Sequence, residues 1–305
     1  MTVNAPVIEQ FRTSGDARPE STSPSEAGSP TEPAPSLVIE PPRGWTSLNL
    51  AELWRYRDLL SLLIWRDISS RYRQSVIGYG WAVLKPVLTM VIFTVIFGRV
   101  AKIPSDGAPW ALFCFVALVP WMYFSSSVSS VTTSVVQSSQ FLTKVYFPRL
   151  VLPLASAAVG LMEWAVQMLV LAVLMAAYQV VPPWHIVFAP VFAVICVLVT
   201  LAFGIWLTAL NVKYRDVGQI VPFLLQAWMY LCPIVYPISL IPPRWRLIYA
   251  LNPMVGVVEG FRWSILGTST PDWTMMFVSL AMVTGLFVGG LYYFRKTEIA
   301  FADVI

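Results

Sequence analysis

The sequence predicts an all-α integral membrane protein with six transmembrane helices. Three observations support this class: 57% of the 305 residues are hydrophobic, only 12% are charged, and apolar stretches of spanning length recur along the chain. We also expect an N-terminal amphipathic helix at the membrane interface and short re-entrant helices before the last span. The chain then divides into a tail at 1–42, an interfacial helix region at 43–80 and a transmembrane domain at 81–305.

The tail differs in composition from everything that follows it. Pro, Ser, Thr, Glu, Ala and Gly dominate from Ser14 to Pro42, and no apolar periodicity is present. A segment of this kind cannot bury enough apolar surface to offset its ordering entropy, so we predict that it is disordered. It also lacks the apolar central region of a secretory signal.

A basic stretch leads from the tail into the first span and predicts the interfacial helix. Its apolar face repeats at four-residue steps: Leu60, Ile64, Ile68 and Tyr72. Arg66, Arg71 and Arg73 supply the positive charge that anionic headgroups attract, although Arg71 falls near the apolar face. Gly78 and Gly80 relax the backbone where the chain turns into the membrane.

The apolar stretches set the positions of the spans. The six predicted spans cover about 81–98, 109–135, 148–178, 185–210, 217–240 and 273–294. The third stretch is longer than a bilayer requires, and we expect Pro148 and Pro153 to break its start.

The positions of Lys and Arg predict the orientation. One side of the predicted membrane holds thirteen of them: Arg43, Arg55, Arg57, Arg66, Arg71, Arg73, Lys85, Lys144, Arg149, Lys213, Arg215, Arg295 and Lys296. The other side holds five: Arg99, Lys102, Arg244, Arg246 and Arg262. By the positive-inside rule, both termini are cytoplasmic. The net charge of +4 therefore reflects membrane orientation and is no argument for nucleic-acid binding.

The region between the fifth and sixth spans is apolar but broken by prolines. An amphipathic piece from Val255 to Leu266 carries Glu259 and Arg262 and is too short and too charged to cross. We expect re-entrant or interfacial helices here, on the outer side, with Glu259 and Arg262 forming an outer gate. The alternative is a simple ion pair along one helix, because the two residues are three apart.

Few residues in the chain are suited to catalysis. No Gly-x-x-x-x-Gly-Lys-[Ser/Thr] loop is present, so no ATP site is predicted. The single histidine, His185, begins a span, and the three cysteines lie in apolar spans at unrelated spacing. Glu163 is the one carboxylate expected within the membrane, either bonded to a neighbouring helix or on a substrate path. We therefore predict no metal, no cofactor and no enzymatic activity in this chain.

Several motifs, taken as a set, resemble a known family. They are Arg71–Pro86, Lys144–Arg149, Asn211–Asp216, Pro233–Tyr236 and Asn252–Met254. Over about 50–300 they are similar to the ABC-2 type membrane subunit of bacterial polysaccharide exporters, which carry O-antigen, capsule or wall teichoic acid. The resemblance implies a plasma-membrane homodimer of this chain with two ATP-binding subunits, which hold ATP and Mg and hydrolyse the nucleotide. It also implies export of a lipid-linked glycan.

A permease without a nucleotide site must receive energy through its cytoplasmic loops. The segment from Gln137 to Arg149 is the best candidate for this coupling. Phe141, Val145 and Phe147 offer apolar contacts, and Lys144 and Arg149 offer charge. Lys213 and Arg215 lie in the second cytoplasmic loop and are weaker candidates. The alternative is that these are ordinary positively charged inner loops.

Aromatic residues are the candidates for the glycan path, since the CH faces of sugars stack on rings. The chain has 13 Trp and 12 Tyr, more than two interfacial belts need. The predicted path residues are Trp121, Tyr123 and Phe124 in the second span, and Trp228, Tyr230 and Tyr236 in the fifth. For any one of them, a place in an interfacial belt is the alternative.

Two other functional classes are alternatives to a permease. A transferase acting on polyprenyl-linked sugars would need acid/base or metal-binding residues at one interface, and such residues are scarce. A flippase working without an ATPase would need buried charges along several spans, where only Glu163 and Lys85 qualify.

Overall fold

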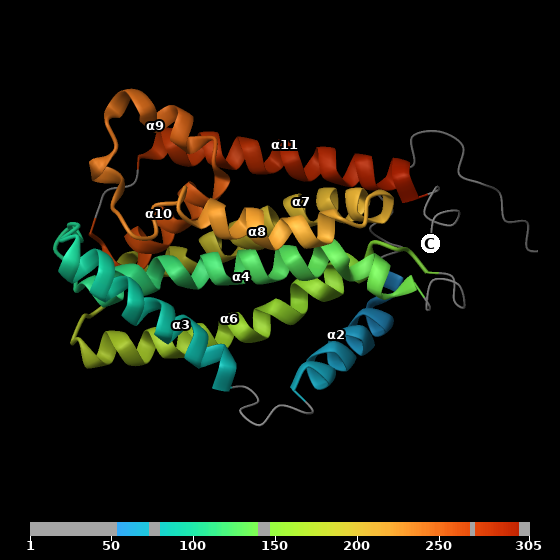
Figure 1. Cartoon of the computed structure of the whole chain (residues 1–305), viewed down its shortest axis with the longest axis horizontal. Helices are drawn as coiled ribbons and strands as arrows, with labels where there is room; N and C mark the ends of the chain where they lie inside the picture. Colours follow the sequence, from blue (N-terminus) through green and yellow to red (C-terminus); the bar gives the residue numbers. More distant parts are fainter. Residues whose placement is uncertain (1–53, 73–79, 140–146, 269–271, 299–305) are drawn as a thin grey trace, which may run out of the picture. The chain divides into compact units, whose positions relative to one another are not determined.

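The structure is a computed structural model that describes residues 54–72, 80–139, 147–268 and 272–298, and its regular elements there are helices (Figure 1). The predicted tail at 1–42 and Arg73 lie outside these ranges. The elements are α2 Arg57–Tyr72, α3 Gly80–Phe93 with its π-helical continuation η1 Thr94–Val100, α4 Trp110–Gln137, α6 Val151–Ala177, η2 Trp184–Phe188, α7 Ala189–Lys213, α8 Val217–Met229, η3 Ile238–Leu240, α9 Pro243–Ala250, α10 Pro253–Leu266 and α11 Trp273–Glu298.

Five helices in the described ranges are long and apolar enough to cross a membrane. They are Gly80–Val100, Trp110–Gln137, Val151–Ala177, Trp184–Lys213 and Trp273–Glu298. These five match the first four predicted spans and the last one. As expected, Pro148 lies outside α6, which begins at Val151. The expected break at Pro153 is wrong, because this residue lies in the first helical turn, where a missing N–H costs little.

The predicted fifth span, 217–240, is not one continuous helix. Helix α8 has 13 residues and rises about 20 Å, which is short of the ~30 Å hydrocarbon core. Pro233 and Pro237 follow it and cannot donate helical hydrogen bonds. The Ser239 hydroxyl donates to the Asp106 carboxylate, which places the end of this stretch beside the loop before α4. Residues 217–240 thus combine a short helix with an irregular, largely buried segment.

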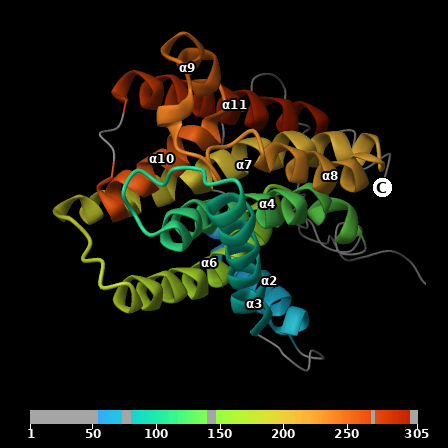
Figure 2. The same ribbon diagram turned by 60° about the vertical axis from the view of Figure 1, so that its left-hand side comes forward.

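Helix α4 occupies the centre of the bundle, with α6 on one side and α7 and α8 on the other (Figures 1 and 2). Every residue from 111 to 121 is buried. Farther along α4, the hydroxyls of Thr132, Thr133 and Ser134 donate to carbonyls of their own helix, which satisfies these three donors.

Two glycines let neighbouring helices approach α4 closely. A Cβ at Gly204 of α7 would lie 2.5 Å from Cγ1 of Val131, and one at Gly160 of α6 would lie 2.1 Å from Oγ of Ser127. Any larger residue would push α6 or α7 away from α4. The central position of α4 therefore depends on these backbone contacts as well as on apolar burial.

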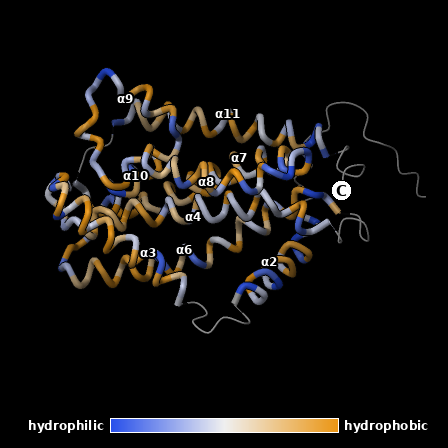
Figure 3. The backbone as a smooth tube through the Cα atoms, viewed as in Figure 1, coloured by the Kyte–Doolittle hydropathy of each residue, from blue (hydrophilic) through white to orange (hydrophobic). Residues whose placement is uncertain are grey.

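The long helices are rich in apolar residues, as Figure 3 shows along α3, α7 and α11, and several of these residues are exposed. Large exposed residues occur on each of these helices: Leu88, Val91 and Ile92 on α3, Val191 and Val194 on α7, Phe277 and Val288 on α11. Soluble monomers do not expose apolar surface on this scale. The bundle thus has the exterior of a membrane domain.

The two ends of the bundle differ in what they gather. Following the predicted orientation, we call the end with the last residues of α4, α7 and α11 and the first residues of α6 and α8 the inner end. The other, which carries α9, is the outer end. Phe147, Val212 and Phe294 belong to one buried cluster at the inner end. Helix α2 packs on this cluster through Leu63, while the predicted face residues Leu60 and Ile64 are half-buried.

Helix α10 corresponds to the predicted amphipathic piece and is buried against α4, α7 and α11. Asn252 caps its start by accepting a hydrogen bond from the Met254 N–H at 3.2 Å, and Gly267 ends it with a positive φ of 66°. Helix α9 before it is mostly exposed. Neither helix is long enough to cross a bilayer.

Candidate functional site

A polar stripe runs along the last turns of α4. Its members are spaced at i, i+3, i+4, i+7 and i+8: Ser130, Thr133, Ser134, Gln137 and Ser138. Residues three and four apart share one face of a helix. Because the first half of α4 is packed in apolar surroundings, this stripe marks where the helix meets a polar space instead.

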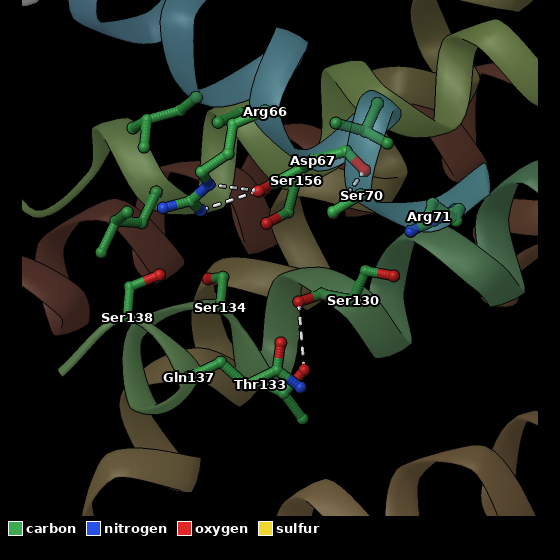
Figure 4. A pocket seen from close by; sticks show the side chains of 14 residues that line it. Arg66, Asp67, Ser70, Arg71, Ser130, Thr133, Ser134, Gln137, Ser138 and Ser156 are labelled. Carbon is green, nitrogen blue, oxygen red and sulfur yellow. Dashed lines mark hydrogen bonds and ion pairs between the residues drawn. The ribbon is translucent and has the colours of Figure 1, made fainter. Parts of the chain in front are cut away.

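That space is a cleft between α2, α4 and α6, which we call the polar cleft. Its volume is about 580 Å³, and Figure 4 shows the side chains around it. Helix α2 contributes Leu63, Arg66, Asp67, Ser70 and Arg71, the stripe comes from α4, and α6 contributes Leu152, Ala155, Ser156 and Val159. The cleft lies toward the inner end, and sequence reasoning did not identify it. The spacing of the polar residues in 130–138 is the signal that could have found it.

The charged groups of the polar cleft are paired. The Arg66 guanidinium bonds the Asp67 carboxylate with N···O distances of 2.7 and 2.8 Å. Arg71 at the end of α2 contacts Glu163 in the middle of α6 at 2.7 Å. Two residues that were unusual for their positions in the sequence therefore form one ion pair. They are Arg71, near an apolar helix face, and Glu163, inside a predicted span. Glu163 is bonded to a neighbouring helix, which is one of the two roles expected for it.

Of the residues predicted to couple to an ATP-binding subunit, Phe141, Lys144 and Val145 lie outside the described ranges, and the others lie at the inner end. Phe147 is buried in the inner cluster. The Arg149 N–H donates to the Glu298 carboxylate at 3.2 Å, and its guanidinium donates to the Glu298 carbonyl oxygen. Arg149 therefore joins the start of α6 to the end of α11. Lys213 and Arg215 are exposed.

The predicted path residues on α4 are buried within the chain. Tyr123 stacks on Trp164 with ring centroids 4.7 Å apart, and its hydroxyl donates to the Ala157 carbonyl at 3.3 Å. Trp121 and Phe124 are 3% and 0% exposed. In this conformation the three rings contact other parts of the same chain.

The other three path residues lie on or after α8. Trp228 is half-buried against Phe124, with ring centroids 5.5 Å apart, whereas Tyr230 is 52% exposed. The hydroxyls of Tyr236 and Tyr249 share a hydrogen bond of 2.5 Å. Of the six predicted residues, Tyr230 is the most accessible.

Arg262 on α10 holds the irregular segment after α8. Its guanidinium donates to the carbonyl oxygens of Ile234 at 2.8 Å and Tyr236 at 3.3 Å, and it bonds Glu259 at 3.1 Å. Its central carbon lies 3.7 Å from the ring centroid of Phe113. The expected pair along the helix is present, but the carbonyl bonds were not predictable from spacing. We call this group of contacts the arginine clamp.

The carboxylate of the clamp is held in surroundings that disfavour charge. Burial raises the pKa of the Glu259 carboxyl above its ordinary value, and the adjacent Arg262 guanidinium opposes that shift. Glu259 also lines an outer cavity of about 460 Å³ together with Asp106, Arg246 and Asp272. Glu259 therefore belongs both to the clamp and to the lining of this cavity.

Within the described ranges, no group of three or more His, Cys, Asp or Glu residues is placed to hold a metal ion. Cys114, Cys196 and Cys232 are buried free thiols. His185 contacts the rings of Trp184 and Trp263. None of these residues forms a grouping typical of a catalytic site.

Comparison with known proteins gives a consistent set of matches. The profile of a family described as ABC-2 type transporter matches residues 58–266. The chain is 34% identical to an O-antigen export system permease protein, RfbA, from Myxococcus xanthus, over 83% of this chain and 98% of that protein. It is 28% identical to RfbA of Klebsiella pneumoniae over 81% and 95% of the two chains. It is 25% identical to the polysialic acid transport protein KpsM of Escherichia coli over 77% and 92%.

Proposed function

The chain belongs to the ABC-2 type transporter family, and from this we propose that it is the membrane-spanning permease subunit of an exporter of lipid-linked polysaccharide. The observation that carries the proposal is the match to an O-antigen export permease along 98% of that protein's length. The apolar exterior of the bundle supports a multi-pass place in a bacterial plasma membrane.

The energy for export is proposed to come from a separate ATP-binding subunit, present in two copies with ATP and Mg, on a dimer of this chain. The coupling surface would comprise the loops at the inner end, with Phe141, Lys144, Val145, Phe147, Arg149, Lys213 and Arg215. Two contacts support this choice. Phe147 is buried in the cluster at the inner end, and Arg149 is bonded to α11. A displacement of this loop would therefore be transmitted to several helices.

For the glycan path we favour the face that contains Trp228, Tyr230 and Tyr236. Helix α8 exposes Phe223 and Leu224 beside Tyr230, and a second copy of the chain could cover this face. Trp121, Tyr123 and Phe124 would reach such a path only after a movement of α4 relative to its neighbours. The arginine clamp is proposed as part of the outer gate, because it holds the segment between α8 and α9.

Deleting the gene for this chain is expected to remove the polysaccharide from the cell surface and to leave its lipid-linked form inside the cell. Surface glycan and extracted lipid-linked glycan, measured with and without a plasmid copy, provide the test. An unchanged amount of surface glycan would refute the proposal. Continued export after inactivation of the partner's ATP site would favour the alternative of a flippase without an ATPase.

Cysteine labelling tests the proposed orientation, with both termini in the cytoplasm. Asp216→Cys lies in an exposed loop at the inner end, and Arg244→Cys lies on the exposed helix α9. A membrane-impermeant maleimide added to intact cells with a permeable outer membrane should label Arg244→Cys and leave Asp216→Cys unlabelled until the inner membrane is opened. The native cysteines are buried, so the wild-type chain is the control. Labelling of Asp216→Cys in intact cells would reverse the orientation.

A further inference from the structure

The polar cleft is lined by residues of three helices, and the proposed function gives it no role. We infer that it binds uncharged sugar units of the exported glycan at the inner end, next to the lipid anchor. This inference rests on the proposed function and adds to it the chemistry of one binding step. The volume of the polar cleft, about 580 Å³, falls within the range of roughly 300–1,000 Å³ for small-molecule sites.

The first argument is the hydrogen-bonding capacity of the α4 wall. Thr133 and Ser134 donate their hydroxyl protons to carbonyls of their own helix, which leaves their oxygen lone pairs to accept. Ser130 and Ser156 add hydroxyls from two different helices, and Gln137 adds an amide. Such a wall of alternating donors and acceptors matches the hydroxyl groups of a sugar.

The second argument is charge. Each arginine of the described lining is neutralised by a carboxylate, Arg66 by Asp67 and Arg71 by Glu163. An anionic ligand would have to compete with these carboxylates and would meet their repulsion. A neutral ligand meets neither cost, so the pairing favours an uncharged polar ligand over a phosphate.

The third argument is the orientation of the helix ends. Helix α4 presents its C-terminal end to the cleft, where the helix dipole is negative and repels anions. At the start of α6, the N–H groups of Val151 and Leu152 already bond the carbonyls of Pro148 and Arg149, and Pro153 has no N–H. Within the described residues, these two helix ends therefore offer no cradle of backbone N–H groups of the kind that binds phosphate.

The lining of the cleft is also partly apolar. Leu63 of α2 and Leu152, Ala155 and Val159 of α6 contribute to it. A sugar ring has both hydroxyl groups and flat CH faces, so a lining of hydroxyl groups and aliphatic side chains suits it. A free phosphate would form no favourable contact with these aliphatic side chains.

Binding to the purified complex of this chain with its ATP-binding subunit tests the inference. The test variant is Ser130→Ala/Thr133→Val/Ser156→Ala, which removes hydroxyls from α4 and α6 with little change in volume. The matched control is Thr89→Val/Thr284→Val, which removes two exposed hydroxyls that bond their own helices elsewhere. The probes are a short delipidated fragment of the exported glycan and inorganic pyrophosphate.

We expect the Kd for the glycan fragment to rise about tenfold or more in the test variant and to stay unchanged in the control, since each lost hydrogen bond weakens binding roughly 2- to 10-fold. Pyrophosphate should not bind the cleft. An unchanged glycan Kd, or pyrophosphate binding that disappears in Arg66→Ala, would overturn the inference. In a second test, Ser130→Cys modified after folding with a bulky maleimide should block export, and undiminished export would also overturn it.

The outcomes separate this inference from the proposed function. If gene deletion abolishes export but the test variant binds glycan and exports like the wild type, the exporter assignment holds and the cleft assignment fails. If gene deletion leaves export intact, the exporter assignment itself fails.

Discussion

Replacing Arg262 by alanine is expected to lower the free energy of unfolding by about 3–5 kcal/mol, because it breaks a buried ion pair on one side only. Arg262 is 2% exposed and bonds the Glu259 carboxylate and the carbonyl oxygens of Ile234 and Tyr236. All three acceptors would lose a charge-assisted hydrogen bond in buried surroundings. In detergent, the thermal transition should fall by on the order of 10 °C.

Two further variants make this result interpretable. Arg244→Ala removes an exposed arginine from α9, and the expected change is within about 0.5 kcal/mol. Arg262→Lys keeps the charge but loses the planar fork that reaches two carbonyls, so its melting temperature should lie between the others. Equal melting temperatures for Arg262→Ala and Arg244→Ala would show that the clamp contributes nothing to stability.

The arginine clamp also accounts for the break in the predicted fifth span. Irregular backbone at membrane depth is tolerated only where it is buried in protein and its polar groups are satisfied. The segment from Cys232 to Val235 is buried, and Arg262 satisfies two carbonyls in and beside it. The clamp therefore stabilises an irregular segment at the place proposed for the outer gate.

The sequence predicted the long helices well because bilayer thickness acts on length and composition alone. Spans one to four and the last one are found within a few residues of their expected positions. The prediction of a continuous fifth span was wrong, because hydropathy does not distinguish a continuous apolar helix from a short helix followed by Pro233 and Pro237. The prolines were visible, but the carbonyl partner that makes the break tolerable lies on another helix.

The candidate site was less predictable, because it depends on contacts between distant segments. In the sequence, Glu163 is a carboxylate within a predicted span and Arg71 lies near an apolar helix face. The packing of α2 on α6 brings the two into one ion pair. Aromatic composition pointed to Trp121 and Tyr123, yet these rings fill the space around α4. A residue type indicates what a side chain can do, whereas its exposure follows from the tertiary arrangement.

The ion pair between Arg71 and Glu163 ties the helix before the first span to the middle of α6. The two side chains are 36% and 22% exposed, and the N···O distance is 2.7 Å. The other described ion pairs join residues of the same helix, as Arg57 and Asp58 do in α2. The pair is therefore the charged contact most able to hold α2 against the bundle and keep the polar cleft in shape.

Reversing one charge of this pair is expected to destabilise the contact, and reversing both should restore it. Arg71→Glu or Glu163→Arg alone replaces attraction by repulsion between like charges, at a cost on the order of 1–2 kcal/mol for a partly exposed pair. The double variant should recover most of the folded yield and surface export per folded protein. Arg57→Glu, at an exposed pair, is the matched control and should behave like the wild type. If the double variant is as defective as the sum of the two single variants, the pair does not couple α2 to α6.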